Sequence, residues 1–184
     1  MRLLIVYATT EGQTRKIARF CADRLSQSGH SVELLPAADA EGIDWPRIAG
    51  AILAGSVHMG RVQEGLERFA AAHAVDLGAR PSLFLQVSLA AAGDDPEERA
   101  DIERIAGDFC ARTGWQPDRT LQVAGAFRFT QYDFFRRWAM RWIASQKGER
   151  IRPGEDREYT DWTELADALD AWLAATSERE ETAK

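Results

Sequence analysis

Cysteine is scarce in this sequence. Of the 184 residues only Cys21 and Cys110 are cysteines, and they form no Cys-x-x-Cys motif and join no cluster of other metal ligands. Because structural metal sites and disulfide frameworks need several such residues at short spacings, the sequence argues against both. Each cysteine lies in a segment with helical periodicity, where a buried free thiol is the usual state.

Long apolar runs are absent too, although 45% of the residues are hydrophobic. No stretch approaches the ~18 consecutive apolar residues of a membrane span. The N-terminus leads directly into a strand rather than into a signal peptide. The formal net charge of −6 argues against general nucleic-acid binding. We therefore expect one substantial core and residence in the cytoplasm or on the cytoplasmic side of the membrane.

What the sequence does contain at its start is a buried strand followed by a threonine-rich turn. Residues 3–7 read LLIVY, which is apolar on both faces and suits a central strand. TTEGQT follows over 9–14, and helical periodicity over 13–28, so hydroxyl and backbone N–H groups converge at a helix N-terminus, where anions bind. The two common nucleotide loops do not fit, since no Gly-Lys-Ser/Thr follows and Gly12 stands alone. A capped helix without any ligand is the alternative.

Strand and helix patterns alternate along the rest of the chain. Such alternation predicts right-handed crossovers and an α/β fold with a doubly wound, five-stranded parallel sheet in the order 2-1-3-4-5. In that order the loops after the first, third and fourth strands lie together at the switch point, where a ligand binds. We expect a single domain over 1–176 and a charged tail over 177–184. The predicted strands cover 3–7, 31–35, 49–55, 83–87 and 121–129, and the predicted helices cover 13–28, 62–74, 96–113 and 161–175.

Residues from about 130 to 158 exceed what closure of such a domain requires. At 100° per residue, 131–147 forms an amphipathic helix with Trp138 and Trp142 on one side and arginines on the other. The stretch 127–152 holds seven basic and two acidic residues within an acidic chain. These features favour docking on an anionic membrane surface or on a partner. Plain packing on the sheet edge stays open, and nucleic acid fits least.

The turn 9–14 resembles the phosphate loop of flavodoxins, and longer segments resemble one bacterial family in particular. These segments are TTEGQTR near the start, GSVHMGR after the third strand, WQPDRTLQVAGAFRF around the fifth strand, YDFFRRWAMRWI in the insertion and REYTDW before the last helix. Together they resemble the flavodoxin-type, quinone-dependent protoporphyrinogen IX dehydrogenases of bacteria, which are protoporphyrinogen oxidases. The resemblance covers nearly the whole chain.

The resemblance implies a flavodoxin-like flavoprotein of heme biosynthesis that carries FMN and lies peripherally on the inner membrane. Its implied partners are protoporphyrinogen IX as substrate, menaquinone or ubiquinone as electron acceptor, and an anionic membrane surface contacted by the 131–147 helix. The oligomeric state, a homo-oligomer included, stays open. The expected FMN contacts are, in chain order, Thr9, Thr10, Glu11, Gly12, Gln13, Thr14, Ser56, Val57, His58, Met59, Gly60, Ser88, Leu89 and Ala90.

Other residues near such a site are expected to have separate roles. His58 is the one imidazole near it, and we expect it to pack or to hydrogen-bond rather than to act as an acid or base. Met59 stands where this family can carry tyrosine, so the second loop offers no aromatic ring to stack on the flavin. A guanidinium group can bind a carboxylate through two hydrogen bonds, so arginines are suited to the substrate propionates. The alternative is that these arginines form a basic surface that contacts anionic lipid. The expected partners of the substrate propionates are Arg61, Arg128, Arg136 and Arg137.

Two other functions fit parts of the pattern. An electron-carrier flavodoxin without an organic substrate of its own would suit the acidic remainder of the chain. A flavodoxin-like interaction domain that has lost its cofactor would suit Met59 and the plain third loop. The intact TTEGQT turn argues against that loss, and the Arg- and Trp-rich insertion argues against a simple carrier.

Overall fold

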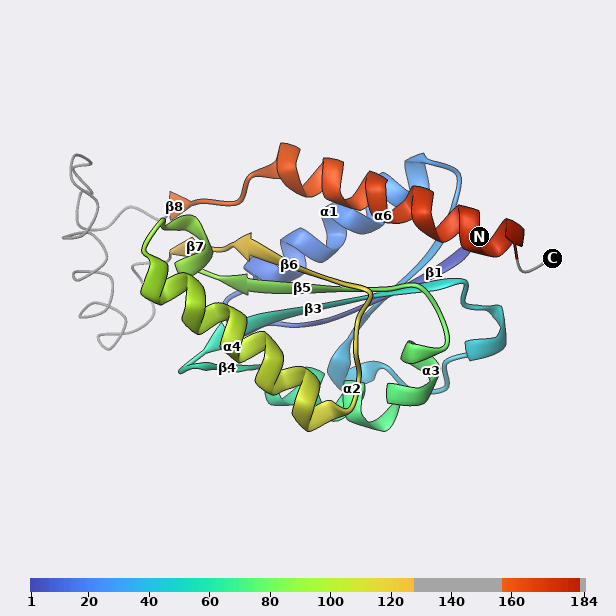
Figure 1. Ribbon diagram of the computed structural model, residues 1–184. Helices are drawn as coiled ribbons and strands as arrows, with labels where there is room; N and C mark the ends of the chain where they lie inside the picture. The colour runs from blue at the N-terminus through green and yellow to red at the C-terminus, as the bar shows by residue number, and fades with distance from the viewer. Residues whose placement is uncertain (128–156, 183–184) are drawn as a thin grey trace.

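The computed structural model describes residues 1–127 and 157–182. Its main sheet has five parallel strands in the order β2-β1-β3-β5-β6, which confirms the predicted doubly wound order (Figure 1). A sixth strand, β4, pairs antiparallel with the end of β3. A separate two-stranded ribbon joins β7 to β8. The strands are β1 (Arg2–Ala8), β2 (Ser31–Pro36), β3 (Gly50–His58), β4 (Arg61–Val62), β5 (Ser82–Ser88), β6 (Arg119–Ala124), β7 (Ala126–Phe127) and β8 (Arg157–Glu158).

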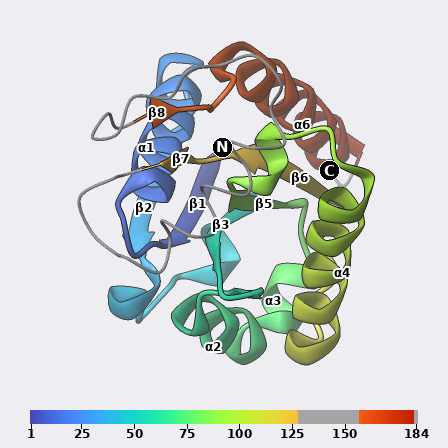
Figure 2. The same cartoon turned by 90° about the vertical axis from the view of Figure 1, so that its left-hand side faces the viewer.

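Helices cover both faces of the sheet. Figures 1 and 2 show α1 and α6 on one face and α2, α3 and α4 on the other. Three short 3-10 turns, η1, η2 and η3, lie in the connections. The bounds are α1 (Gln13–Gln27), η1 (Ala37–Asp39), η2 (Trp45–Arg47), α2 (Glu64–Ala72), α3 (Ala74–Gly78), η3 (Ala90–Ala92), α4 (Pro96–Thr113) and α6 (Trp162–Thr182).

Strand β1 contributes side chains to the core layers on both faces of the sheet. Leu3 and Ile5 pack in the layer under α1 and α6, whereas Leu4 and Val6 pack in the layer under α2 and α4. All four side chains are fully buried. Because successive side chains point to opposite faces of a strand, a run that is apolar at every position is what a doubly covered strand requires. Each such side chain contributes about 1.5–3 kcal/mol by leaving water.

Small residues in β3 let a helix approach the sheet closely. A Cβ atom at Gly55 would lie 2.7 Å from Leu66 Cδ2 and 2.8 Å from Val62 Cγ1. Contacts of that length do not occur between packed carbon atoms, so any side chain at this position would push α2 and β4 away from the sheet. Close packing of α2 and β4 on β3 therefore requires glycine at position 55.

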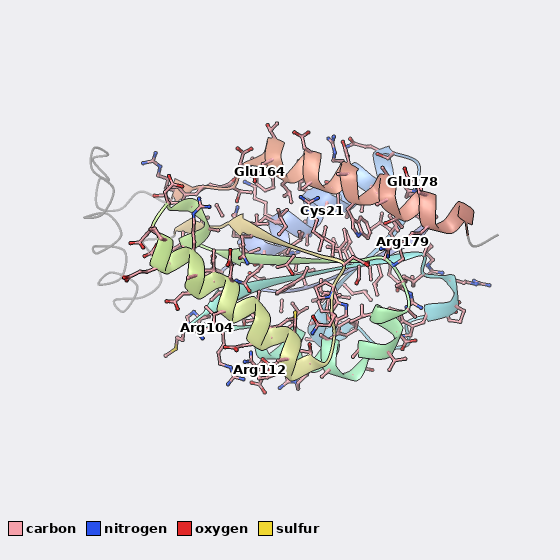
Figure 3. All side chains as sticks on the ribbon, in the orientation of Figure 1. Cys21, Arg104, Arg112, Glu164, Glu178 and Arg179 are labelled. Atoms are coloured by element: carbon pink, nitrogen blue, oxygen red, sulfur yellow. The ribbon has the colours of Figure 1, made fainter. Side chains whose placement is uncertain are left out.

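The two cysteines lie in opposite layers of the core. Cys21 belongs to the layer between α1 and the sheet (Figure 3), and Cys110 belongs to the layer between α4 and the sheet. Both are buried free thiols, as expected. Burial raises the pKa of the Cys21 thiol to about 12, against a weaker opposing effect of its backbone hydrogen bond. Burial also raises the pKa of Cys110.

Several predicted boundaries were wrong. The strand predicted over 49–55 runs from Gly50 to His58, so residues 56–58 of the predicted second loop belong to β3. The helix predicted over 62–74 begins only at Glu64, because Arg61 and Val62 fold back on β3 as β4. The strand predicted over 121–129 starts at Arg119 and breaks at Gly125, after which β7 leaves the sheet. The last helix does not end at 175 but continues to Thr182.

Tertiary contacts explain the extra length of α6. Thr176 is 1% exposed, so the helix is still packed on the sheet at that point. One turn later, Arg179 Nη1 donates to Asp118 Oδ1 at 2.9 Å (Figure 3). The predicted helix over 131–147 lies outside the described residues. Within 1–127 and 157–182, no helix has the length and apolar character needed to cross a bilayer.

Candidate functional site

Three predicted site loops meet at one edge of the sheet. They follow β1, β3 and β5, which are neighbours in the sheet and parallel, so their carboxyl ends lie side by side. Figure 2 looks onto this edge. The ends of β6 and the ribbon of β7 and β8 lie at the same edge. The topology therefore brings together the segments 9–14, 56–60 and 88–90, as the sequence predicts.

The first loop leads into α1 through a left-handed glycine. Gly12 has φ 91°, a conformation that costs an L side chain about 1–2 kcal/mol. Its N–H donates to Thr9 Oγ1 at 3.0 Å, and the first helical hydrogen bond runs from Lys16 N to Gly12 O at 3.1 Å. The N–H groups of residues 13–15 therefore precede the hydrogen-bonded part of the helix and point outward from its start.

No side chain in the described part of the structure caps α1. By contrast, α4 is capped by the preceding Asp95, whose Oδ1 accepts from Glu97 N at 2.8 Å and from Glu98 N at 3.4 Å. An uncapped helix start carries a partial positive charge and unsatisfied donors, which is the chemistry that binds a phosphate group. The start of α1 is thus equipped to hold an anion.

The second loop is a tight hairpin between β3 and β4. His58 pairs with Arg61, leaving a two-residue turn of Met59 and Gly60 with φ values of 50° and 75°. Positive φ at both central residues is the requirement of a type I′ hairpin turn, and glycine meets it more easily than methionine. Met59 is 78% exposed, so its side chain extends from the tip of the hairpin. His58 is half-buried.

A glutamine that the sequence analysis missed joins the first two loops. Gln63 Nε2 donates to Thr10 Oγ1 at 2.5 Å and to Ser56 Oγ at 3.1 Å. Its backbone N–H also donates to Ser56 O at 3.2 Å. Gln63 lies between β4 and α2 and carries no motif, so only the fold reveals that it bridges two loops that are about fifty residues apart in the chain.

The third loop is fixed by Ser88. Its Oγ accepts from Ala91 N at 3.2 Å, which stabilises the turn that holds Leu89 and Ala90. Its carbonyl accepts from Gly125 N at 2.9 Å. A Cβ at Gly125 would lie 3.4 Å from Val87 Cγ1, which is an ordinary packing contact. Ser88 is 8% exposed, and it supports the loop from beneath.

The segment before α6 holds the start of α1. Thr160 Oγ1 lies 2.9 Å from Gln13 Nε2 and 2.7 Å from Ala124 O, and both Gln13 and Thr160 are buried. Lys16 Nζ pairs with Glu158 Oε2. Glu158 Oε1 accepts from Trp162 Nε1 at 2.7 Å.

The ionisation of Glu158 reflects these partners. Desolvation by burial is the largest single influence and would raise its pKa. Hydrogen bonds from Lys16, Trp162 and Gln13, together with the Lys16 charge, outweigh burial and hold the pKa of Glu158 below its ordinary value.

The predicted propionate-binding arginines are only partly described. Arg61 Nη2 lies 3.4 Å from Glu67 Oε1, and Arg112 donates to both oxygens of Glu67 at 3.0 Å each. Arg61 therefore stands beside the second loop, in a weak pair with a carboxylate that has a stronger partner. Arg128, Arg136 and Arg137 lie outside the described residues.

Comparison with known proteins gives a matching family and a similar relative. The model of the flavodoxin domain family matches residues 4–152. A protoporphyrinogen IX dehydrogenase [quinone] of Escherichia coli (strain K12) is 29% identical over 167 residues, which cover 90% of this chain and 91% of the relative.

Solved structures show the same fold. A short-chain flavodoxin associated with a non-canonical PDU bacterial microcompartment superimposes with a TM-score of 0.58 at 12% identity, covering 96% of this chain and 99% of the other. Oxidised flavodoxin 1 from Bacillus cereus gives a TM-score of 0.51 at 17% identity, covering 78% and 95%. At these identities the likeness concerns the fold alone.

Proposed function

The chain belongs to the flavodoxin domain family, and from that premise we propose that it is an FMN-dependent oxidoreductase that converts protoporphyrinogen IX to protoporphyrin IX. The electrons pass to menaquinone or ubiquinone. The observation that supports this substrate is the similarity to a relative named protoporphyrinogen IX dehydrogenase [quinone], which extends over 90% of the chain.

The start of α1 fits the phosphate end of FMN. It combines an uncapped helix N-terminus with the left-handed Gly12, whose N–H donates to Thr9 Oγ1. The hydroxyls of Thr9, Thr10 and Thr14 would complete the site. The partial charge of the helix end and the outward N–H groups of residues 13–15 would hold the phosphate without a lysine. Glu11 and Gln13 complete this set of contacts.

The other two loops would line the ring system. Ser56 to Gly60, at the end of β3, and Ser88 to Ala90, at the end of β5, would contact the ring through backbone groups and side-chain packing. The bound flavin would supply the hydride and electron chemistry. With Met59 at the tip of the second loop, that loop would offer no aromatic ring to stack on the flavin, and an open face of the flavin would suit a flat tetrapyrrole or quinone. His58 serves as a hydrogen-bonding or packing residue here.

The proposed reaction transfers hydrogen from the porphyrinogen to the quinone, so the chain has to bind and orient the porphyrinogen. Each step removes a hydrogen pair, two electrons and two protons, from the porphyrinogen, and reduction of the quinone to a quinol consumes both. The protein must therefore hold the macrocycle against the site and keep its propionates in water or on cations. Arg61 suits that task, because exchange of its weak surface pair with Glu67 for a propionate costs little. Arg128, Arg136 and Arg137 are proposed as its partners.

The predicted 131–147 helix would bring this site to an anionic membrane surface, where the quinone is dissolved. The protein would then act peripherally on the cytoplasmic side of the inner membrane. The charge difference between the basic stretch 127–152 and the acidic remainder supports this orientation. We propose 1–176 as one domain that carries this insertion.

Anaerobic mixing tests the function directly. FMN-loaded protein is mixed with protoporphyrinogen IX while flavin absorbance and porphyrin fluorescence are followed, and a soluble quinone analogue is then added. Bleaching that the quinone reverses, with porphyrin formed above the rate without enzyme, is the expected result. A flavin that stays oxidised here but accepts electrons from a flavodoxin reductase would instead favour the electron carrier.

Two matched variants sharpen this test. Arg61→Gln removes the guanidinium beside the second loop and should raise KM for the porphyrinogen by roughly 3- to 10-fold, with kcat nearly unchanged. Arg68→Gln removes an exposed guanidinium that pairs with Glu64 at 2.6 Å on α2, and it should leave both constants unchanged. Equal kinetics of the two variants would remove Arg61 from the proposed substrate site.

A further inference from the structure

A buried hydrogen-bond chain connects the start of α1 to the segment before α6. Thr160 Oγ1 lies 2.7 Å from the carbonyl oxygen of Ala124, which can only accept, so the hydroxyl hydrogen is committed to that carbonyl. Thr160 Oγ1 then accepts from Gln13 Nε2, 2.9 Å away. Both side chains are less than 9% exposed. The direction of each bond, and with it the orientation of the Gln13 amide, is thereby fixed.

The same segment binds α1 a second time, one turn further along. Residues 13 and 16 lie on one face of the helix because they are three positions apart. Lys16 pairs with Glu158, and its ammonium group lies 5.2 Å from the centre of the Trp162 ring. Phe20 continues this contact, with its ring 4.9 Å from that of Trp162. One face of α1 is therefore held against the segment 158–162 by three residues, spaced three and four positions apart.

This anchoring matters because α1 lacks a cap of its own. Gln13 is the first residue of the helix, and its backbone N–H is one of the outward donors at the proposed phosphate site. A buried amide and a buried hydroxyl each cost free energy unless they are hydrogen-bonded, so two apolar side chains would stabilise this position at least as well. A hydrogen-bonded polar pair fixes the orientation of the Gln13 side chain, which apolar packing would not do.

We propose that Thr160 is a positioning residue for the phosphate group of FMN, acting through Gln13. Its hydroxyl holds the Gln13 side chain and thereby the first turn of α1, so that the N–H groups of residues 13–15 converge on one point. The inference rests on the FMN site proposed above and adds to it a residue that is 147 positions away in the chain from Gln13. Glu158 supports the same turn through Lys16 and through a hydrogen bond from the Gln13 side chain.

The test compares FMN with riboflavin, which has the same ring system and no phosphate. The full chain is freed of flavin, and the dissociation constants of both ligands are measured by fluorescence titration. Thr160→Val keeps the shape of the side chain and removes its hydroxyl. We expect this variant to lower the preference for FMN over riboflavin by ~10-fold, because the N–H groups of the first turn would no longer be oriented toward the phosphate. That change corresponds to about 1.4 kcal/mol.

Thr176→Val is the matched control. Thr176 is a buried threonine whose hydroxyl donates to Trp172 O at 2.9 Å within α6, away from the start of α1. Its loss should change the preference for FMN less than twofold. Thr160→Ser, which keeps the hydroxyl, should restore the wild-type preference. The phosphorus NMR signal of bound FMN should shift in Thr160→Val and stay in place in Thr176→Val.

The outcomes separate the two proposals. A wild-type protein with no preference for FMN over riboflavin would overturn the proposed phosphate site itself. A wild-type preference that Thr160→Val leaves intact, or that both valine variants lower equally, would overturn the role of Thr160 alone. Should Thr160→Val not fold, Gln13→Met, which removes the amide at constant length, must lower the preference in the same way, and an unchanged preference there refutes the inference.

Discussion

The helices α1 and α6 lie on the same face of the sheet and begin at the same edge, yet their N-termini differ (Figures 1 and 2). Asp161 precedes α6, and its Oδ1 accepts from Thr163 N and Glu164 N at 2.9 Å each. Gly12 precedes α1 and offers no side chain. Both helices carry the same partial charge at their starts. The chain itself neutralises that charge in α6 and leaves it in α1.

The comparison separates a structural helix start from a binding one. An aspartate cap satisfies two backbone donors and typically stabilises a protein by about 1 kcal/mol. Leaving α1 without such a cap forgoes that stability and keeps the donors available to an external anion. The neighbouring segment 158–162 then holds α1 in place from the side, through Gln13 and Lys16.

Giving α1 a carboxylate should have the largest effect. Gly12→Asp places a negative charge where we propose the phosphate, and we expect FMN affinity to fall by at least ~10-fold while riboflavin affinity changes little. Gly12→Asn has the same shape and the same left-handed strain without the charge, so it should lose far less. Equal losses in the two variants would show that strain at Gly12, and not charge, governs binding.

Removing the cap of α6 should have the next largest effect, and on stability instead of binding. Asp161→Ala should lower the free energy of unfolding by about 1 kcal/mol, because two N–H groups lose their acceptor. Asp161→Asn can still accept and should lose only part of this. Urea unfolding monitored by tryptophan fluorescence measures both. A large change in FMN affinity for Asp161→Ala would contradict the division between the two helix starts.

Acid should weaken the contact between α1 and the segment before α6. Because the pKa of Glu158 is lowered in the folded protein, its contribution to stability is present above the pKa of the unfolded chain and is lost as pH falls through the folded pKa. Wild type should therefore exceed Glu158→Gln in unfolding midpoint near pH 7, and the difference should shrink from about pH 5 downward. A difference that is constant with pH would contradict this assignment.

The far ends of the two helices should matter least. Arg24 on α1 pairs with Asp170 on α6, and a hydrogen bond from Arg24, opposed by desolvation, lowers the pKa of Asp170. Both side chains are exposed, where solvent and salt screen the interaction. Arg24→Gln should lower the melting temperature less than Asp161→Ala, and 1 M salt should remove most of the difference. A loss that persists in high salt would show a packing role for the Arg24 side chain.

Much of the fold was predictable because its signals are local. The helix predicted over 96–113 agrees with α4, since Asp95 caps it, Pro96 begins it and Gly114 ends it with φ 70°. The LLIVY run announces a strand buried on both faces, and the alternation of strands and helices gives the sheet order. The three site loops follow from that order, since carboxyl ends of neighbouring parallel strands must meet.

Local signals fail where a distant segment decides the conformation. The sequence around Gly125 reads as one strand, but the chain turns away there because Tyr159 N binds Gly125 O and β8 pairs with β7. Gln63 reads as an ordinary helix-start residue, and only the folded hairpin places it between Thr10 and Ser56.

The sequence by itself therefore determined the layered α/β architecture, the order of the sheet and the threonine-rich turn before α1, because periodicity, caps and turn residues act over a few positions. The tertiary structure alone decided how that turn is held. Gln13 and Thr160 are 147 residues apart, and a hydrogen bond between them has no trace in local pattern. It exists because the sheet brings the two helix starts to one edge, where a buried amide must find a partner.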